Sequence, residues 1–586
     1  MHKTDFIKFL YLLDMNKLNM NKLLSLIIMV SFHLACQSQP NQSQLTDSLK
    51  SKQSQLPDSI KLKIDNIFKS YTDKTPGCAI AIIRNGELVF EKGYGMANLE
   101  YNIPNSPKTV FHIASESKQY VAFCMLMLEK DGTLSLNDDI RKYLDYVPDF
   151  HEKITIKHLI YHTSGLRDQW QLLANAGWQL DDVITQEHVI KLVSKQKELN
   201  FRPGQEHMYC NTGYTLMAEI VKKVSGLTLR QYTEKFIFQP LGMKDTHFHD
   251  NYQELVPNRA YSYTPNGKGG YQHSVLSYSI VGATSLLTTV EDETKWLNNF
   301  ATGQVGGKDL IQKMHEVGVL NDGRKLNYAF AISMDKFKGW NQIGHGGGDA
   351  GFRTYACRYP EKNLGVVVFS NSGFVNPGGL VRQVAELLIT DTKEETKPAA
   401  NTNFADSNSL KKLQGKYYSA RGDLGEMYWK DGKLYRAGRN GSNPVESKFA
   451  IAGPGRYVLP SGGPVVIVEP KNIKGDSVLE MTMESPVSSV VFKRQPAVLP
   501  KITAEYAGRY FSDETEAFYT VTERDGKLTL EHRKFSGVNL TLIAPDQFTT
   551  PNWWMNHIRF LRDKDKKITG FEVNSGRILG LKYKKL

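Results

Sequence analysis

This 586-residue chain has few cysteines, and the marks of several common protein classes are missing from it. Its five cysteines form no Cys-x-x-Cys pair and there is no His-rich cluster, so the sequence gives no support for a structural zinc site. The net charge of +12 is basic, yet no run of Lys and Arg and no interleaving of basic with aromatic residues indicates a nucleic-acid partner. A solvated surface with a mild bias toward anionic neighbours is the simpler interpretation.

The amino terminus has the pattern of an export signal. Lys22 precedes an apolar run over 23–35, which has the length of a signal core and is too short to cross a bilayer as a mature helix. Segment 32–36 resembles a bacterial lipobox that ends at Cys36, although His33 stands where leucine is expected. We predict a signal segment over 1–36 with lipidation at Cys36, ordinary cleavage being the alternative, and a flexible tether rich in Gln, Ser and Pro over 37–57.

The other cysteines are expected to be buried and unpaired. Cys78, Cys124 and Cys357 lie in apolar runs, and Cys210 is the fourth. An exported chain permits disulfides, so a bridge is the alternative. The segment 247–250, His-Phe-His-Asp, has metal-ligand residue types but is expected to be a surface loop.

Residues 58–392 have the pattern of one α/β unit. An amphipathic helix is expected over 59–71, and a hairpin over 79–94 turns at Asn85-Gly86, a pair that supplies the positive φ angles of a type I′ turn. Strands return only at 352–358 and 364–370, and a helix follows near 380–389. Strands from both ends with helices between them predict an antiparallel sheet flanked by a helical lobe.

Residues 408–586 are rich in expected strands and contain an internal repeat. Segment 413–419 matches 506–512, Asp431-Gly432 matches Asp525-Gly526, and segment 492–494 matches 583–585, at offsets between 91 and 94 residues. Alternating strands and Asp-Gly turns predict two small antiparallel β-barrels, over 408–496 and 500–586. A linker with few apolar residues, 393–407, precedes them.

Three short motifs in the first region carry candidate chemistry: Ser115-Glu116-Ser117-Lys118, Tyr209-Cys210-Asn211 and His345-Gly346-Gly347. Ser115 is expected to open a helix whose segment 120–128 is apolar on every face and is therefore expected to be buried. Lys118 follows one turn later on the same face, where burial would lower its pKa and let it take the Ser115 hydroxyl proton. The alternative is that Ser115 only caps the helix and Lys118 is a surface charge.

The second and third motifs supply the rest of an acyl-transfer site. Tyr209 is expected on a loop, where its phenol can return a proton to a leaving group, and Asn211 can orient Lys118 and hold a substrate amide. The alternative for Tyr209 is a turn tyrosine that packs on the core. The glycines after His345 allow an edge strand to approach a ligand closely.

The order and spacing of the motifs resemble the serine β-lactamases and penicillin-binding proteins, specifically the class C-like branch, which includes D-aminopeptidases and esterases. The resemblance implies an α/β (α+β) catalytic domain with an antiparallel sheet and a helical lobe. The layout of the chain, with two expected lipocalin-like β-barrels after the catalytic domain, resembles that of D-aminopeptidases. The family resemblance also implies that the Gly348 N–H is an oxyanion donor beside the Ser115 N–H. The residues it assigns are catalytic Ser115, Lys118 and Tyr209, and substrate-binding or oxyanion Asn211, His345, Gly347 and Gly348.

The third motif departs from the family pattern, and this decides the expected substrate. The family has Lys-Thr-Gly where this chain has His345-Gly346-Gly347, and a neutral His attracts a carboxylate much less than Lys does. We therefore expect a D-aminopeptidase-like enzyme or an esterase. A D-Ala-D-Ala carboxypeptidase or β-lactamase is the first alternative, and a non-catalytic penicillin-binding sensor is the second. Asp349 either meets a substrate ammonium or is a turn residue.

The expected partners and location combine this resemblance with the composition and the amino-terminal pattern. The substrate is a small peptide or ester, for which cell-wall fragments are one source. No cofactor, metal or nucleic acid is expected. The chain is expected in the bacterial periplasm or cell envelope, with membrane contact only through a lipid anchor.

Overall fold

The computed structural model describes residues 55–393, 407–437, 445–446, 450–453, 456–459, 466–475, 477–485 and 489–586. The signal segment with Cys36, most of the tether and most of the linker lie outside the described residues. None of the described helices is long and apolar enough to cross a membrane.

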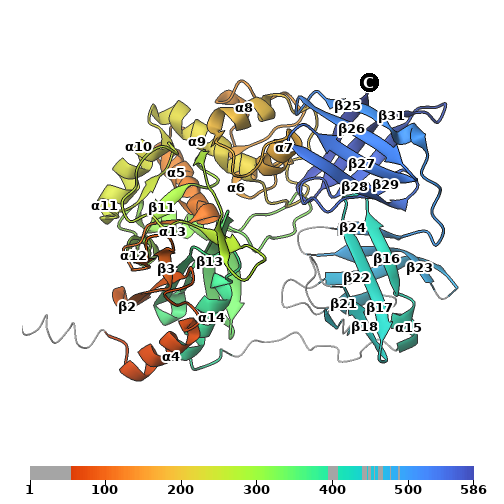
Figure 1. Ribbon diagram of the computed structural model, residues 1–586. Coiled ribbons are helices and arrows are strands. Elements are labelled where there is room, and N and C mark those ends of the chain that lie inside the picture. Colours follow the sequence, from red (N-terminus) through yellow and green to blue (C-terminus); the bar gives the residue numbers. More distant parts are fainter. Residues whose placement is uncertain are drawn as a thin grey trace, which may run out of the picture. The chain divides into compact units, whose positions relative to one another are not determined.

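A six-stranded antiparallel sheet is the centre of residues 58–392, the expected catalytic region (Figure 1). Its order is β12-β13-β14-β15-β1-β2. Strands from both ends of the region meet where β1 pairs with β15, from Cys78 opposite Ser370 to Arg84 opposite Leu364. The split sheet that the sequence predicts is therefore confirmed. The strands are β1 (Cys78–Arg84), β2 (Glu87–Tyr94), β12 (Ser333–Phe337), β13 (Trp340–Asp349), β14 (Phe352–Tyr359) and β15 (Leu364–Ser370).

The hairpin between β1 and β2 has the predicted turn. Asn85 has φ 53° and Gly86 has φ 84°, so both central residues take the left-handed conformation that a type I′ turn requires.

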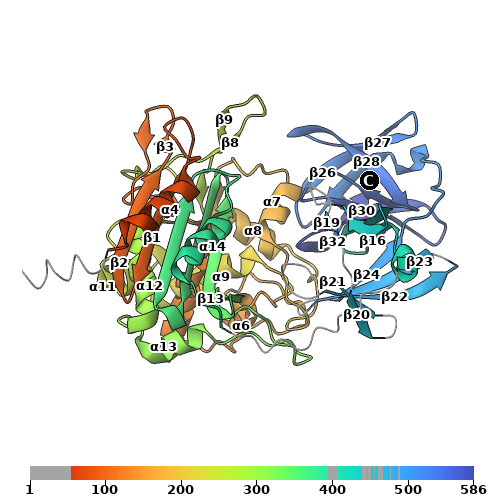
Figure 2. The same cartoon turned by 90° about the horizontal axis from the view of Figure 1, so that it is seen from below.

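Helices cover the sheet on both faces. All seven residues of β15 are buried, which a sheet strand achieves only when both of its faces are packed. Helix α14 (Pro377–Leu388) packs on β14, β15 and α4 (Asp58–Phe68), and α4 and α14 lie side by side in Figure 1 and Figure 2. Helix α12 (Val290–Thr302) packs on β1, β2 and β15.

The helical lobe is built on α5 (Ser117–Lys130) and α9 (Asn211–Ser225), which contact each other. Residues 117–126 and Leu128 of α5 are buried, as the apolar pattern predicts. The Tyr120 ring stacks on Trp296 of α12 with 4.4 Å between centroids, which ties the lobe to the helices over the sheet. Shorter helices α6 (Ile156–Ile160), α7 (Gln169–Asn175) and α8 (Gln186–Ser194) complete it.

The C-terminal repeat forms two β structures. Strands β25 to β32 close into a barrel, and β16 to β24 form one nine-stranded sheet with β19 and β20 at its edges among the described residues. The barrel strands are β25 (Gly508–Ser512), β26 (Ala517–Arg524), β27 (Lys527–His532), β28 (Phe535–Ala544), β29 (Gln547–Thr549), β30 (His557–Arg562), β31 (Ile568–Ser575) and β32 (Ile578–Lys585). The sheet strands are β16 (Gly415–Ser419), β17 (Leu424–Lys430), β18 (Lys433–Arg436), β19 (Val445–Glu446), β20 (Ala450–Gly453), β21 (Arg456–Leu459), β22 (Val466–Lys474), β23 (Ser477–Glu484) and β24 (Ser489–Arg494).

The two β structures keep the repeat in atomic detail. Asp431-Gly432 has φ values of 51° and 74°, and Asp525-Gly526 has 52° and 74°, so the same turn recurs. In each copy a buried tyrosine at the first strand donates to a carbonyl four residues back: Tyr417 Oη to Leu413 O at 3.1 Å, and Tyr510 Oη to Tyr506 O at 2.7 Å.

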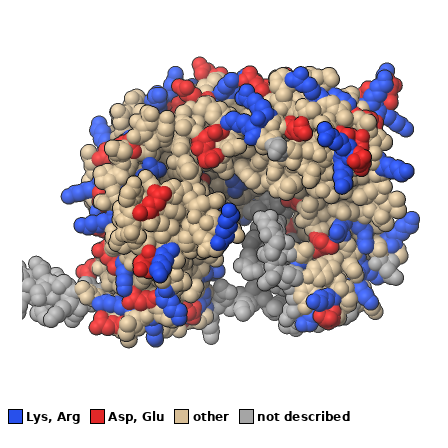
Figure 3. Space-filling model, in the orientation of Figure 1, with Lys and Arg blue, Asp and Glu red and all other residues tan. Residues whose placement is uncertain are grey.

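Cysteine placement and surface charge agree with the sequence analysis. Cys78, Cys124, Cys210 and Cys357 are each buried and unpaired. On the face drawn in Figure 3, Lys and Arg alternate with Asp and Glu, with no extended area of one sign.

Candidate active site

Ser115 lies in a tight turn between the sheet and the buried helix. It is the middle residue of the 3₁₀ turn η2 (Ala114–Glu116), which follows strand β5 (Phe111–His112). The regular α-helix begins two residues later, at Ser117, so the prediction that Ser115 opens α5 is corrected: a 3₁₀ turn precedes the helix. Ala114 has φ 48°, a left-handed conformation that costs a non-glycine residue about 1–2 kcal/mol. The chain therefore accepts strain immediately before Ser115.

Lys118 is completely buried and contacts Ser115. Its Nζ lies 3.0 Å from Ser115 Oγ, 2.9 Å from Asn211 Oδ1 and 2.6 Å from the Ala283 carbonyl oxygen. Burial lowers the pKa of Lys118 to about 7, against the opposing effect of the Asp349 and Asp168 carboxylates. The alternative of a surface charge is excluded, because the Lys118 side chain is 0% exposed.

Asn211 is held in place by an aspartate that the sequence analysis missed. Asp168 Oδ2 accepts the Asn211 backbone N–H at 2.7 Å and the Asn211 side-chain amide at 2.9 Å. This fixes the amide nitrogen toward Asp168 and the amide oxygen toward Lys118. Asp168 is also the N-cap of α7, where its side chain accepts from the Trp170 N–H. The only local signal in the sequence is that cap position.

Tyr209 lies among aromatic rings and cations. Its ring centroid is 4.1 Å from that of His162, 5.0 Å from Lys118 Nζ and 4.8 Å from Arg577 Cζ. Burial raises the pKa of Tyr209, while Ser115 and Arg577 lower it, and the net direction is upward. Among the residues that the structure describes, no group accepts or donates in hydrogen-bond geometry at the Tyr209 hydroxyl. The raised pKa keeps the phenol protonated, and its oxygen is buried in this structure.

His345 is neutral and belongs to a hydrogen-bonded chain. Its Nδ1 lies 2.6 Å from the Gly346 carbonyl and its Nε2 lies 3.1 Å from Tyr328 Oη. This arrangement assigns the proton to Nδ1, so Tyr328 O–H donates to Nε2. The same tyrosine oxygen lies 3.2 Å from His162 Nε2, and His162 Nδ1 accepts the Cys210 N–H. Burial lowers the pKa of His345 to about 4, with the Lys118 charge adding to the effect.

Strand β13 brings the glycines against the Ser115 turn, but it is not an edge strand of the sheet. Strand β12 lies outside it, which corrects that expectation. However, β12 pairs only with 340–344, so 345–349 has no partner strand on that side among the described residues. A Cβ on Gly347 would lie 2.1 Å from the Ile113 carbonyl oxygen and 2.5 Å from Thr354 Oγ1, so only glycine fits there.

A cavity of about 690 Å³ opens beside the far end of this strand, from Gly348 onward. The catalytic region supplies much of its wall, and three lining residues, Trp553, Gly576 and Arg577, come from the C-terminal barrel. Asp349 lines the cavity too, but its Oδ2 accepts a short hydrogen bond from Thr284 and lies 3.1 Å from His112 Nε2. The second carboxylate oxygen of Asp349 makes none of these bonds.

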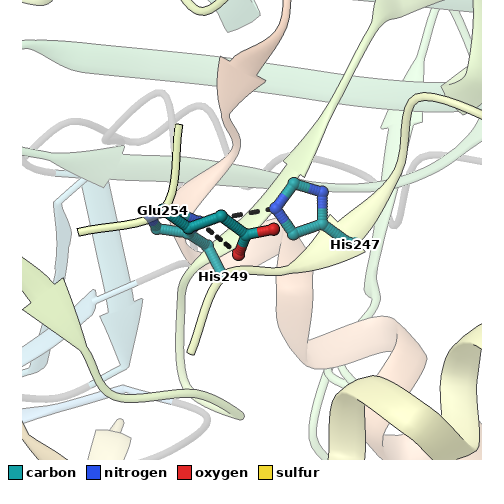
Figure 4. Close-up of side chains that lie close together, drawn as sticks. All are labelled: His247, His249 and Glu254. Carbon is teal, nitrogen blue, oxygen red and sulfur yellow. Dashed lines mark hydrogen bonds and ion pairs between the residues drawn. The ribbon is translucent and has the colours of Figure 1, made fainter. Parts of the chain in front are cut away.

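The segment with metal-ligand residue types forms a cluster of its own. Ligand atoms of His247, His249 and Glu254 lie within 4.8 Å of one another (Figure 4). Glu254 accepts two hydrogen bonds from Arg230, at 2.5 and 2.7 Å, and Arg259 Nη1 lies 3.3 Å from His249 Nε2. Arginines therefore already partner the Glu254 carboxylate and one ring nitrogen of His249.

With the geometry described, the family can be assigned. Residues 64–390, more than half of the chain, match the protein-family model described as Beta-lactamase. The chain belongs to the β-lactamase family. It is 24% identical over 543 residues to a D-aminopeptidase of Brucella melitensis, an alignment that covers 88% of this chain and 96% of that one.

Solved structures extend the similarity over both parts of the chain. A match with 25% identity and a TM-score of 0.52 is the octameric penicillin-binding protein homologue of Pyrococcus abyssi, which covers 74% of this chain and 99% of that one. The structure titled SurE has 16% identity and a TM-score of 0.50 over 75% of this chain, and supports the fold alone. The family model and the D-aminopeptidase relative support a hydrolase of the β-lactamase family.

Proposed function

We propose that this β-lactamase-family hydrolase is a serine enzyme that forms an acyl-enzyme on Ser115. Its substrates are peptide amides with an amino-terminal D-residue, or short esters. The observation that carries the proposal is the contact between Ser115 and a fully buried Lys118 whose pKa is about 7. Half of the lysine is then a free amine at neutral pH, which an exposed lysine is not.

The hydrogen bonds of Lys118 suit a proton acceptor. A neutral amine has two N–H donors and one lone pair. Asn211 Oδ1 and the Ala283 carbonyl can only accept, so they take the two donors. The lone pair is then left for the Ser115 hydroxyl at 3.0 Å.

The reaction follows from this arrangement. Lys118 takes the Ser115 proton as Oγ attacks the substrate carbonyl carbon, and the negative charge moves to the carbonyl oxygen. The N–H groups of Ser115 and Gly348 stabilise that charge. The protonated Tyr209 gives its proton to the leaving amine or alkoxide as the carbon–leaving-group bond breaks, and it recovers a proton from Lys118. Water then attacks the ester by the same path in reverse.

The neutral His345 supports the choice of substrate. Its burial and its bond from Tyr328 keep it uncharged, so the cleft has no fixed cation where the family has lysine. A terminal substrate carboxylate would find no counter-charge there, which disfavours D-Ala-D-Ala peptides and β-lactams. The relatives named D-aminopeptidase point the same way.

We further propose that the enzyme is exported and held in the cell envelope through lipidated Cys36. The apolar run before Cys36 supports this. Metabolic labelling with a fatty-acid analogue tests it: label is expected on the wild type and absent from Cys36→Ser. Equal labelling of both would leave ordinary cleavage as the better account.

Serine substitutions test the mechanism. Ser115→Ala is expected to abolish turnover and labelling by a fluorescent fluorophosphonate. Ser117→Ala is the matched control: its buried Oγ accepts from the Leu286 N–H, so its loss costs about 1–3 kcal/mol of stability and leaves Ser115 and Lys118 in contact. Ser194→Ala, on the exposed end of α8, is expected to change nothing. Equal loss of activity in Ser115→Ala and Ser117→Ala would contradict the assignment.

A further inference from the structure

The C-terminal barrel sends an arginine to the active site. Arg577 lies in the turn between β31 and β32, and its backbone is fixed to the catalytic region on both sides. Its N–H donates to Gln171 Oε1 at 2.7 Å, and its carbonyl accepts from Asn200 Nδ2 at 2.9 Å. The position of the turn is therefore set by the protein and does not depend on a ligand.

A buried ion pair supports that position. Arg167 of the catalytic region is 0% exposed, makes a short hydrogen bond to Glu514 of the barrel, and donates to the carbonyls of Leu579 and Gly580. These carbonyls directly follow the turn. Arg577 thus belongs to a preorganised part of the site.

The Arg577 guanidinium has N–H donors that make no hydrogen bond among the described residues. Its Cζ lies 4.8 Å from the Tyr209 ring centroid, and Nη1 lies 3.8 Å from Asp168 Oδ2. That distance is too long for a hydrogen bond, and Asp168 Oδ2 already accepts two N–H groups from Asn211. Among the described residues no hydrogen bond from the guanidinium is found, and the side chain is 43% exposed at the cavity. A guanidinium with free donors is the protein group best suited to a carboxylate.

Ser115 does not line the cavity beside Arg577, so an acyl group held on Ser115 would reach it by passing Gly348. In the proposed reaction the leaving group departs toward Tyr209 and His345, and neither lines this cavity. Its wall begins at Gly348, the proposed oxyanion donor. The side chains of Trp170, Tyr278 and Trp553 give its wall aromatic surface, and the Trp170 and Tyr278 rings stack on each other.

We propose that Arg577 binds a carboxylate on the acyl half of the substrate, so that the preferred acyl group is anionic, such as an amino-terminal D-glutamyl or D-aspartyl residue. This rests on the proposed function and deepens it. The carboxylate oxygen of Asp349 that has no hydrogen bond among the described residues suits the α-ammonium of such a residue. Asp349 lines the same cavity, so the two charges of an acidic amino-terminal residue each find a partner. Arg577 also acts on the pKa of Lys118, lowering it, and the test must separate the two roles.

The test compares D-glutamyl and D-glutaminyl p-nitroanilide, which have the same shape and differ by one charge. The wild type is expected to give a kcat/KM about 10–100-fold higher for D-glutamyl, the range that one or two charge-assisted hydrogen bonds provide. Arg577→Gln is expected to remove this preference, so that the two substrates give the same kcat/KM. Arg577→Lys keeps the positive charge but lacks the forked donors of a guanidinium, and is expected to keep part of the preference for D-glutamyl. Arg524→Gln, on the exposed surface of the same barrel, is the matched control and is expected to keep the full preference.

Two results would overturn the proposal. One is a wild type with no preference for D-glutamyl. The other is an Arg577→Gln variant in which both substrates slow equally and the pH midpoint of kcat/KM moves for both, since Arg577 would then act only on Lys118.

A binding measurement keeps this inference separate from the reaction. In the Ser115→Ala background, D-glutamyl amide is expected to bind about 10–100-fold tighter than D-glutaminyl amide by calorimetry, and Arg577→Gln to equalise them. Equal affinities with Arg577 present would overturn the inference even if Ser115 proves catalytic. Unequal affinities without any acyl-enzyme on Ser115 would support the inference and contradict the proposed reaction.

Discussion

The pH dependence of acylation gives the sharpest test of the Lys118 environment. The quantity varied is the pH at which kcat/KM is measured. Because the reaction needs the free amine of Lys118, kcat/KM should follow the neutral fraction of a group whose pKa is about 7. That fraction is about 0.1 at pH 6 and about 0.9 at pH 8, so activity should rise about tenfold across this window and then level off. A lysine at its ordinary pKa of 10.5 would be neutral in only about 3 molecules in 10,000 at pH 7, and its profile would keep rising to pH 10.

The assay needs a substrate that does not itself titrate in this range. p-Nitrophenyl butyrate has no charged acyl group, and its release can be read at the isosbestic wavelength of p-nitrophenol. Ser115→Ala measured at each pH supplies the background hydrolysis. A profile that is flat between pH 6 and 8, or whose midpoint lies above about 9, would refute the reasoning.

Protein stability gives an independent view of the same group. The Lys118 pKa is about 7 in the folded chain and near 10.5 when unfolded, so the unfolded chain binds more protons between these values. The stability contributed by Lys118 therefore rises with pH through that window. Relative to Lys118→Met, the free energy of unfolding of the wild type should increase by up to about 1.4 kcal/mol per pH unit between pH 7 and 10. Parallel stability curves for the two proteins would show that the lysine is not shifted.

Three further predictions follow from the site and its supports. Gly347→Ala should lose most activity, since the added Cβ would lie 2.1 Å from the Ile113 carbonyl, whereas Gly348→Ala meets only an ordinary contact at 3.5 Å and should fold normally by circular dichroism. Glu514→Gln leaves the buried Arg167 charge without its partner and should cost about 3–5 kcal/mol, seen as a lower midpoint of thermal unfolding; an unchanged midpoint would mean that the pair is not buried in solution. EDTA should leave turnover unchanged, and a loss restored by zinc would contradict the metal-free mechanism.

Local sequence signals predicted the elements whose geometry is set by short-range chemistry. Asn85-Gly86 and the two Asp-Gly pairs require left-handed φ angles and take them, and the apolar run after Ser115 is buried as its pattern predicts. Strand 364–370 has the predicted bounds, because a short continuous apolar run rich in valine and bounded by turns is typical of a fully buried strand.

Features that depend on distant packing could not be predicted in this way. Strand β12 is short and has no fully buried residue, so nothing in 333–337 indicates that it covers the outer edge of β13. Asp168 looks like a helix cap, and its contact with Asn211 arises 43 residues away. Arg577 follows Gly576 in an ordinary hairpin turn, and only the docking of the barrel places it beside Tyr209.

The central claim is that Ser115 carries an acyl group during turnover, and mass spectrometry of the quenched enzyme tests it most directly. The purified protein is mixed with a p-nitrophenyl ester or a D-residue amide, quenched in acid within the steady state, and measured intact and after proteolysis. The account predicts a mass increase equal to the acyl group, located on the peptide that contains Ser115 and absent from Ser115→Ala and Lys118→Met. An acyl group on another residue, or turnover in Ser115→Ala at the wild-type rate, would contradict the account.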